Sequence, residues 1–256
     1  MDRSVTCLDA TRRTLLFGAL SLALPARAAR DLVAVGAPFS RVYERVGGAF
    51  TGMGAEILRA VGAQMGQRIN FEMYPWVRAQ SMVAQGQADI LVGPYKTAER
   101  MDMLTFSERP FFQDEMVFYS RIGETFDWDG SFAALRGKRI VVINGWVFGD
   151  EFDRARKDLL IYVTNSVEAA LTMLVVGRVD LFATNRRDTE PAMYALDMVN
   201  NLVPLERVIS VQPAYFGFPR RPEHDKIRLR FDRALNNFAE TGGLRKLGRR
   251  FSLPVP

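Results

Sequence analysis

The chain alternates between short apolar runs and longer stretches in which apolar residues recur at helical spacing. Short apolar runs bounded by polar residues are typical of buried strands, and the helical spacing is typical of helices packed on one face. On this basis we predict strands at residues 32–35, 69–73 and 88–92, with helices at 54–65 and 76–85 between them. Such alternation of strand and helix predicts right-handed crossovers and a largely parallel sheet.

The same alternation begins again after a polar, turn-rich segment at residues 127–130. Extended segments at 116–120 and 215–219 lie on either side of this second cycle. Its predicted elements are a helical turn at 132–135, strands at 139–144, 161–163 and 179–183, a helix at 148–157, and a helix that Ser166 caps and Gly177 ends. The pattern therefore predicts two successive α/β cycles.

The first 28 residues have the features of a secretory signal peptide. Arg12 and Arg13 precede an apolar run at 15–24, and residues 26–28 have the small-x-small form of a cleavage site. The run is about ten residues, shorter than the roughly 20 that span a bilayer. We expect cleavage near Ala28 and a periplasmic location; the alternative is a retained membrane anchor. The paired arginines also resemble a twin-arginine signal, so that route and the Sec route both stay open.

Composition and charge fit a globular protein that does not bind nucleic acid. Hydrophobic residues make up 48% of the 256 residues and charged residues 25%, ordinary values for one large domain or two lobes. The net charge of +5 falls to +3 without the first 28 residues, which hold four Lys/Arg and two acidic residues. So small a positive excess does not favour nucleic acid. Cys7, the only cysteine, lies in the removed segment, so we expect neither a disulfide nor a zinc site.

The most informative segment is 88–112 (ADILVGPYKTAERMDMLTFSERPFF). A buried strand leads into a predicted loop at 94–98, and Arg100 follows. A planar guanidinium just beyond a strand end suits a carboxylate bound through two hydrogen bonds. The alternative is a solvated salt bridge of Arg100 with Glu99 or Asp102.

This segment resembles the G-x-x-x-T-x-E-R segment of the bacterial extracellular solute-binding proteins of family 3, periplasmic receptors for polar amino acids. In that family the arginine holds the ligand's α-carboxylate, and the matching residue here is Arg100. Weaker matches to the family occur in the family's order on both sides of this segment, so that the resemblance spans residues 32–251. They lie at 51–58, 106–112, 135–145, 177–180 and 242–251. The resemblance implies the α/β type 2 periplasmic-binding-protein fold, with two α/β lobes joined by two hinge strands. It implies lobe 1 at 29–119 plus 216–256 and an inserted lobe 2 at 120–215.

The resemblance also implies a function. A protein of this kind captures a small polar, carboxylate-bearing solute by lobe closure and presents it to an inner-membrane ABC permease, as in amino acid transport. It implies a monomer without a cofactor. An alternative is an accessory or sensory binding module for a signalling or enzyme partner. An exported dehydratase-like enzyme is a further alternative, although the acid that such enzymes carry near Asn185 is not evident.

Ligands of two-lobed α/β proteins bind between the lobes, beyond the carboxyl ends of the strands. Residues that follow predicted strands are therefore the candidate ligand contacts. Trp76 matches the aromatic wall of the family, and either Phe39 or Tyr43 would face it. The candidates are Phe39, Tyr43, Trp76, Tyr95, Arg100, Gly145, Trp146 and Asn185.

Two of these candidates replace the Ser or Thr residues that the resemblance implies. Tyr95 stands where the family has a Ser or Thr that bonds the ligand. Trp146 and Val147 stand where the family has Ser and Thr at the start of a lobe 2 helix. Trp146 would fill volume instead of donating hydrogen bonds.

A third departure concerns the ligand's amino group. Asn185 stands where the resemblance implies an Asp that pairs with the α-ammonium, and an unpaired buried ammonium is costly. Asp188 or Glu190 could take that role. Our hypothesis is a small carboxylate with an aromatic or planar portion in place of a standard α-amino acid. A cleft that has lost small-molecule binding is the weaker alternative.

The sequence offers little for catalysis. His224 is the single histidine and lies in a predicted solvated helix start. No G-x-S-x-G is present, and Gly52 and Gly54 lack the third glycine of a dinucleotide fingerprint. We therefore expect a binding protein with no catalytic residues and no metal site.

Overall fold

The computed structural model describes Met1 and residues 30–256, so the predicted signal peptide, apart from Met1, lies outside the described residues. One ten-stranded sheet runs through the described chain, and a separate hairpin pairs β2 (Glu44–Val46) with β3 (Ala49–Thr51). The strands of the large sheet are β1 (Leu32–Gly36), β4 (Ile69–Met73), β5 (Ile90–Tyr95), β6 (Leu104–Phe106), β7 (Phe112–Arg121), β8 (Arg139–Ile143), β9 (Leu160–Thr164), β10 (Leu181–Asn185), β11 (Leu202–Pro204) and β12 (Ser210–Pro219). Their order is β4-β1-β5-β12-β7-β10-β8-β9, with β6 on β12 and β11 on β7.

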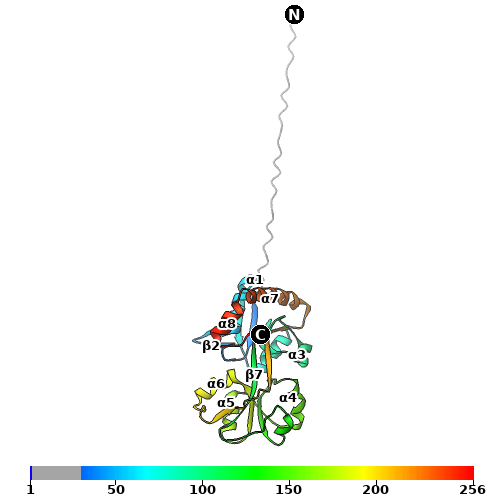
Figure 1. Ribbon diagram of the computed structural model, residues 1–256. Coiled ribbons are helices and arrows are strands. Elements are labelled where there is room, and N and C mark those ends of the chain that lie inside the picture. The colour runs from blue at the N-terminus through cyan, green and yellow to red at the C-terminus, as the bar shows by residue number, and fades with distance from the viewer. Residues whose placement is uncertain (2–29) are drawn as a thin grey trace.

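The helices divide into two groups, and each group surrounds one half of the sheet (Figure 1). They are α1 (Met53–Met65), α2 (Trp76–Ala84), α3 (Ala98–Met103), α4 (Asp150–Ala155), α5 (Val167–Val175), α6 (Arg186–Ala195), α7 (Pro222–Glu240) and α8 (Gly243–Phe251), with 3-10 turns η1 (Phe132–Leu135) and η2 (Arg156–Asp158). Helices α4, α5 and α6 surround one lobe, and α1, α3, α7 and α8 belong to the other. The two α/β lobes predicted from the sequence are confirmed.

Each lobe contains three parallel strands, and an antiparallel pair connects the lobes. Strands β4, β1 and β5 run parallel in lobe 1, and β10, β8 and β9 run parallel in lobe 2. Strands β7 and β12 pair antiparallel between them and contain the extended segments predicted at 116–120 and 215–219. Because both strands pass from one lobe to the other, a change in the angle between the lobes must bend this pair.

Lobe 2 has a hydrophobic core on each face of its sheet. Val117 and Tyr119 of β7 point into one core, and Met116 and Phe118 point into the other. A strand that is buried on both faces reads as a continuous apolar run, since side chains alternate between the faces. This explains why 116–120 shows no polar alternation in the sequence.

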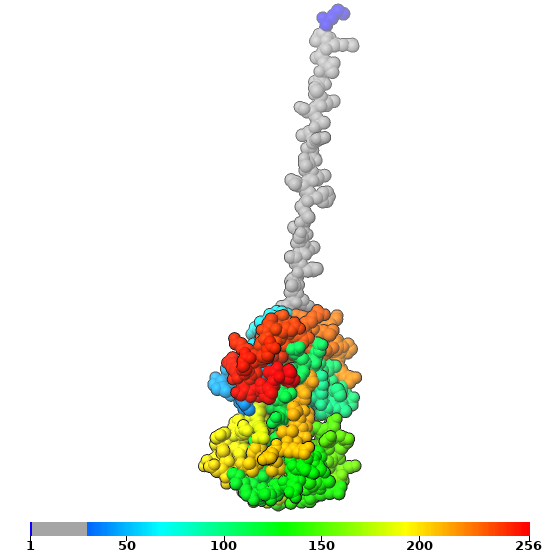
Figure 2. All heavy atoms as spheres, in the orientation of Figure 1, coloured from blue at the N-terminus to red at the C-terminus, as the bar shows by residue number. Residues whose placement is uncertain are grey.

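The last two helices return to lobe 1. Phe231 and Leu235 of α7 and Leu244 of α8 belong to the same hydrophobic core as Leu58 of α1. In Figure 2 the C-terminal residues, in orange and red, cover the part of the surface beside the residues in blue and cyan. Within residues 30–256, no helix combines the length and apolar composition required to cross a membrane.

Three boundaries differ from the sequence prediction, two of them because of long-range strand pairing. Strand β5 extends to Tyr95, which pairs with Ala214 of β12. Strand β10 extends to Asn185 because Asn185 pairs with Met116 of β7. Helix α4 begins after Gly149, whose φ of 99° is outside the helical region, so the first part of the predicted helix 148–157 is a loop.

His224 is buried, and the expectation of a solvated position is wrong. It is 5% exposed, and its Nε2 lies 3.1 Å from an oxygen of Asp89. The Asp89 carboxylate also accepts hydrogen bonds from the Arg30 guanidinium and the Val33 N–H. Burial opposes ionisation of Asp89, but these hydrogen bonds outweigh it and lower its pKa. His224 thus helps to satisfy a buried carboxylate in lobe 1, a partnership that no local pattern reveals.

Candidate functional site

Arg100 lies inside the molecule on a short helix. The sequence predicts a loop up to residue 98, whereas the structure begins α3 at Ala98, where the Thr97 side chain accepts a hydrogen bond from the Arg100 N–H at 3.1 Å. Arg100 is only 4% exposed. Its side chain bonds neither Glu99 nor Asp102, so the alternative of a solvated salt bridge is wrong.

Three neutral oxygens surround the Arg100 guanidinium. Its Nε donates to the Gln80 side chain at 2.9 Å, its Nη1 to the carbonyl of Tyr95 at 3.0 Å, and its Nη2 to the carbonyl of Gly145 at 2.8 Å. Gly145 belongs to lobe 2, so this last bond connects the lobes. Arg100 forms no salt bridge with any residue of the described chain.

Among the described residues, the charge of Arg100 therefore has hydrogen bonds but no carboxylate within salt-bridge distance, and Glu99 and Asp153 act on it only from farther away. Burial lowers the pKa of Arg100 to about 10, so the group stays charged at neutral pH. A buried charge without a partner of opposite charge is unfavourable by several kcal/mol on the usual scale. An anion bound beside this guanidinium would remove that cost.

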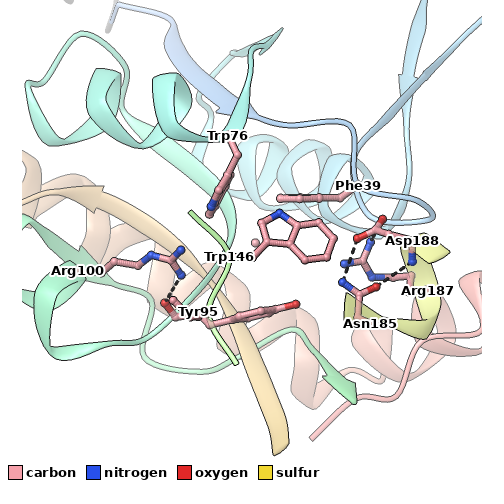
Figure 3. A pocket seen from close by; sticks show the side chains of 10 residues that line it. Phe39, Trp76, Tyr95, Arg100, Trp146, Asn185, Arg187 and Asp188 are labelled. Atoms are coloured by element: carbon pink, nitrogen blue, oxygen red, sulfur yellow. Dashed lines mark hydrogen bonds and ion pairs between the residues drawn. The ribbon is translucent and has the colours of Figure 1, made fainter. Parts of the chain in front are cut away.

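Aromatic rings line the space next to Arg100. The guanidinium lies 5.4 Å from the Trp76 ring, and the Phe39 ring lies 5.1 Å from Trp76 and 6.4 Å from Trp146. The Trp76 Nε1 donates to the carbonyl of Gly145 at 3.1 Å. Figure 3 shows the Trp146 indole in the middle of the cavity, among Phe39, Trp76 and Tyr95. Phe39 meets Trp76 and Trp146 edge to face, at 62° and 63° between the ring planes, so the three rings form an aromatic wall beside Arg100.

A buried ion cluster lies on the opposite side of the cavity. Arg187 of α6 donates to Asp114 of β7 at 2.8 and 3.1 Å, to Asp188 at 2.7 Å, and to the carbonyl of Ser40 at 3.0 Å. The hydroxyl of Tyr95 donates to Asp114 at 2.6 Å. Ser40 belongs to lobe 1 and Asp188 to lobe 2, so the cluster is a second connection between the lobes.

The charges of this cluster depend on one another. Burial opposes the charge on Arg187, but Asp114 and Asp188 outweigh it and raise the Arg187 pKa. Burial raises the pKa of Asp188 in spite of the nearby Arg187 charge. Burial, reinforced by the Asp114 charge, also raises the pKa of Tyr95 well above its usual value. At neutral pH the Tyr95 hydroxyl is therefore protonated and can donate its hydrogen bond.

The structure brings six of the eight candidate residues to one cavity between the lobes. Its volume is about 20 Å³, room for about one water molecule. A larger groove of about 590 Å³ adjoins it along Phe39, Trp76 and Trp146. The residues lining the small cavity are Phe39, Trp76, Gly93, Tyr95, Arg100, Trp146, Val147, Asn185, Arg187 and Asp188. In this structure the lobes are in contact, and a solute of ordinary size requires them to move apart or Trp146 to swing away.

Tyr43 and Gly145 do not line the cavity. Tyr43 is fully buried in lobe 1, where its hydroxyl lies 3.1 Å from the carbonyl oxygens of Ala34 and Glu72 and its ring packs 5.2 Å from Phe50. Of the two rings considered opposite Trp76, only Phe39 faces it. Gly145 touches the site through its carbonyl oxygen, which receives the hydrogen bonds of Trp76 and Arg100.

The sequence does not point to several site residues: Gly93, Gln80, Asp114 and, most importantly, Arg187. Arg187 follows Arg186 in an apparently polar helix start, and no local signal separates the two arginines. Asn185 caps this helix: its side chain accepts from the Asp188 N–H at 2.8 Å and donates to the Asp188 carboxylate at 3.1 Å. The cap directs Asp188 toward Ser40, whose N–H lies 2.9 Å from it.

The fold and the site define a class: two-lobed α/β proteins of the type 2 periplasmic-binding-protein fold, with a site between the lobes. The family model of the bacterial extracellular solute-binding proteins, family 3, matches residues 33–253. The chain belongs to this family, whose members are binding proteins, as the sequence predicts. No curated protein sequence matches the chain.

Solved structures with the same fold include a histidine kinase sensor domain and amino-acid-binding proteins. A histidine kinase sensor domain with similarity to periplasmic binding proteins matches with a TM-score of 0.78 and 19% identity, over 89% of this chain and 98% of that one. The arginine-, lysine-, histidine-binding protein ArtJ of Geobacillus stearothermophilus matches with a TM-score of 0.72 and 19% identity, over 87% and 95%. A mutant of ArgBP from T. maritima matches at 0.73 and 17%, over 86% and 94%. At such low sequence identities, the structural similarity establishes a shared fold and nothing more.

The described residues do not form a metal centre. Within residues 30–256, no three His, Cys, Asp or Glu side chains converge as metal ligands would. The charged groups of the site, Arg100 and the Arg187 cluster, are suited to binding and ion pairing.

Proposed function

We propose that this protein is an exported receptor that captures a small carboxylate-bearing solute between its lobes. The observation that carries this proposal is the Arg100 guanidinium, which is buried at the lobe interface and hydrogen-bonded only to neutral oxygens. A bound carboxylate would supply the missing charge through two parallel hydrogen bonds. The contrast with Arg187, which has two carboxylate partners, supports the assignment of the anion to Arg100.

The solute we propose has a planar or aromatic portion and is not a standard α-amino acid. Trp76 presents its ring face to Arg100, and Phe39 and Trp146 line the same cavity. Asn185 is neutral, and the Asp188 carboxylate already bonds Arg187. An ammonium group would therefore enter the cavity without a free acidic partner, which is unfavourable.

We propose that capture proceeds by a shift from open to closed lobes. The solute makes contacts to both lobes that exist only in the closed state, and these contacts drive the shift. The Arg100 bond to the Gly145 carbonyl already connects the lobes, and an incoming carboxylate would take over part of this role. The closed form would then be presented, as a monomer, to an ABC permease in the inner membrane.

A thermal-shift screen tests this proposal. The mature protein, from residue 29 onward, is screened against aromatic and aliphatic carboxylates, the standard amino acids and simple amines. A solute at 100 times its dissociation constant stabilises the folded state by about 2.7 kcal/mol, a shift that is easily measured. We expect stabilisation by carboxylates that have no ammonium group, and none by the standard amino acids or the amines. If no carboxylate in the screen stabilises the protein, the proposal fails.

Gly145→Ala is expected to weaken the affinity for the carboxylate found in the screen by about tenfold. A Cβ at this position would lie 3.0 Å from Val77 and 3.3 Å from Trp76 of the other lobe, and the φ of +73° disfavours a side chain. Lobe closure is thus opposed. Isothermal titration calorimetry measures the change. The control is Gly137→Ala, where φ is +75° but no atom lies within 4 Å. Equal affinities of the two variants would contradict the prediction.

A sensory module is the second candidate. The histidine kinase sensor domain, with a TM-score of 0.78 over 98% of its length, supports it. In that case the closed lobes would signal to a partner protein in place of a permease. Genes for a permease and an ATPase beside this one favour transport, and a kinase gene favours sensing.

A further inference from the structure

In the ion cluster around Arg187, all four carboxylate oxygens of Asp114 and Asp188 already accept hydrogen bonds. One Asp188 oxygen accepts from Arg187 at 2.7 Å and the Ser40 N–H at 2.9 Å, and the other accepts from Asn185 at 3.1 Å. One Asp114 oxygen accepts from Arg187 at 3.1 Å, and the other accepts from Arg187 at 2.8 Å and Tyr95 at 2.6 Å. A cationic group on a solute would find no free carboxylate oxygen here.

Arg187 also occupies a site that is shaped for a guanidinium. The group lies 5.6 Å from the Phe39 ring and 5.3 Å from the Phe112 ring, and it is 4% exposed. Two carboxylates and two rings around one planar cation combine ion pairing, bidentate hydrogen bonding and cation–π contact. These features would bind an organic cation if the chain did not supply one itself.

We propose that Arg187 is a specificity-determining residue: a built-in cation that fills the cation subsite of the cavity and thereby excludes amines, amino acids and guanidinium compounds as solutes. This inference rests on the proposed function, since it narrows the solute class to anions without a cationic group. It predicts that removal of the Arg187 side chain changes the cavity from one that rejects organic cations to one that binds them.

The test uses ethylguanidinium chloride, which has the head group of the deleted side chain. The mature wild-type protein and Arg187→Ala are each titrated with it by calorimetry and thermal shift, with potassium chloride as the ionic-strength control. We expect at least about tenfold tighter binding to Arg187→Ala than to the wild type, because the variant has two unpaired carboxylates. Arg186→Ala is the matched control. Arg186 is the neighbouring residue, and its salt-bridge partner is Glu115, at 3.9 Å, outside the Arg187 cluster, so its loss should leave the wild-type response unchanged.

A second substitution tests whether the gain in ethylguanidinium binding comes from the carboxylates of the Arg187 cluster. Arg187→Ala combined with Asp188→Asn should lose most of the ethylguanidinium binding, because one of the two charges is gone. If Arg187→Ala does not fold alone, it is refolded with and without ethylguanidinium, and we expect recovery only with it. No gain in the single variant, or no recovery on refolding, overturns the inference.

Two further results separate this inference from the proposed function. Stabilisation of the wild-type protein by an amine or a standard amino acid overturns the role of Arg187 and leaves a carboxylate at Arg100 untouched. Absence of any carboxylate ligand defeats the proposed function, whereas the ethylguanidinium comparison between the wild type and Arg187→Ala still yields a clear result.

Discussion

Arg100→Met is expected to abolish binding of the carboxylate found in the screen, with a loss of affinity of at least about 100-fold. Methionine keeps much of the side-chain volume but removes the charge and the paired N–H donors. The site is almost dry, with Arg100 4% exposed, so water does not replace these donors. Isothermal titration calorimetry on the mature protein measures the loss.

Two companion variants make this experiment specific. Arg100→Lys keeps the charge but not the planar pair of donors, and should bind with intermediate affinity. Arg249→Met removes an exposed arginine of α8, far from the cavity, and should bind as the wild type does. If Arg100→Met retains wild-type affinity, the carboxylate is held elsewhere and the central assignment is wrong.

Much of the fold is predictable from the sequence because the residue pattern of many elements matches the way those elements pack. Strand β4 at Ile69–Met73 and the turn η1 at Phe132–Leu135 match the prediction at both ends. Helix α5 begins after Ser166, whose side chain accepts from the Ala169 N–H at 3.2 Å, as the cap predicts. In each case the signal lies within a few residues of the element that it specifies.

The site is less predictable because distant segments build it. Arg187 meets Asp114 and Ser40, which lie far from it in the sequence, and the run Arg186-Arg187 reads only as polar. Phe39 and Tyr43 are both aromatic and both follow β1. The turn that pairs their backbones leaves Phe39 at the cavity and Tyr43 in the core, a choice that only tertiary packing decides.

Arg187→Met is expected to destabilise the folded protein by about 3–5 kcal/mol at pH 7. The substitution leaves Asp114 and Asp188 buried without the cation that bonds both. Urea unfolding of the mature protein measures the loss. The matched control is Arg186→Met: Arg186 and its partner Glu115 are 36% and 54% exposed and 3.9 Å apart, so its loss should cost less than about 1 kcal/mol.

The loss should shrink as the pH falls, and this distinguishes unpaired charge from lost packing. Burial already raises the Asp188 pKa with Arg187 present, and without Arg187 that pKa rises further. An acid with a raised pKa in the folded state destabilises that state as the pH increases from its unfolded pKa, about 3.9, through the folded value. The difference in unfolding free energy between the variant and the wild type should therefore be largest at pH 7 and smaller at pH 5. A difference that does not change with pH would mean that Arg187 stabilises the molecule by packing, and that its charge is not what the two carboxylates need.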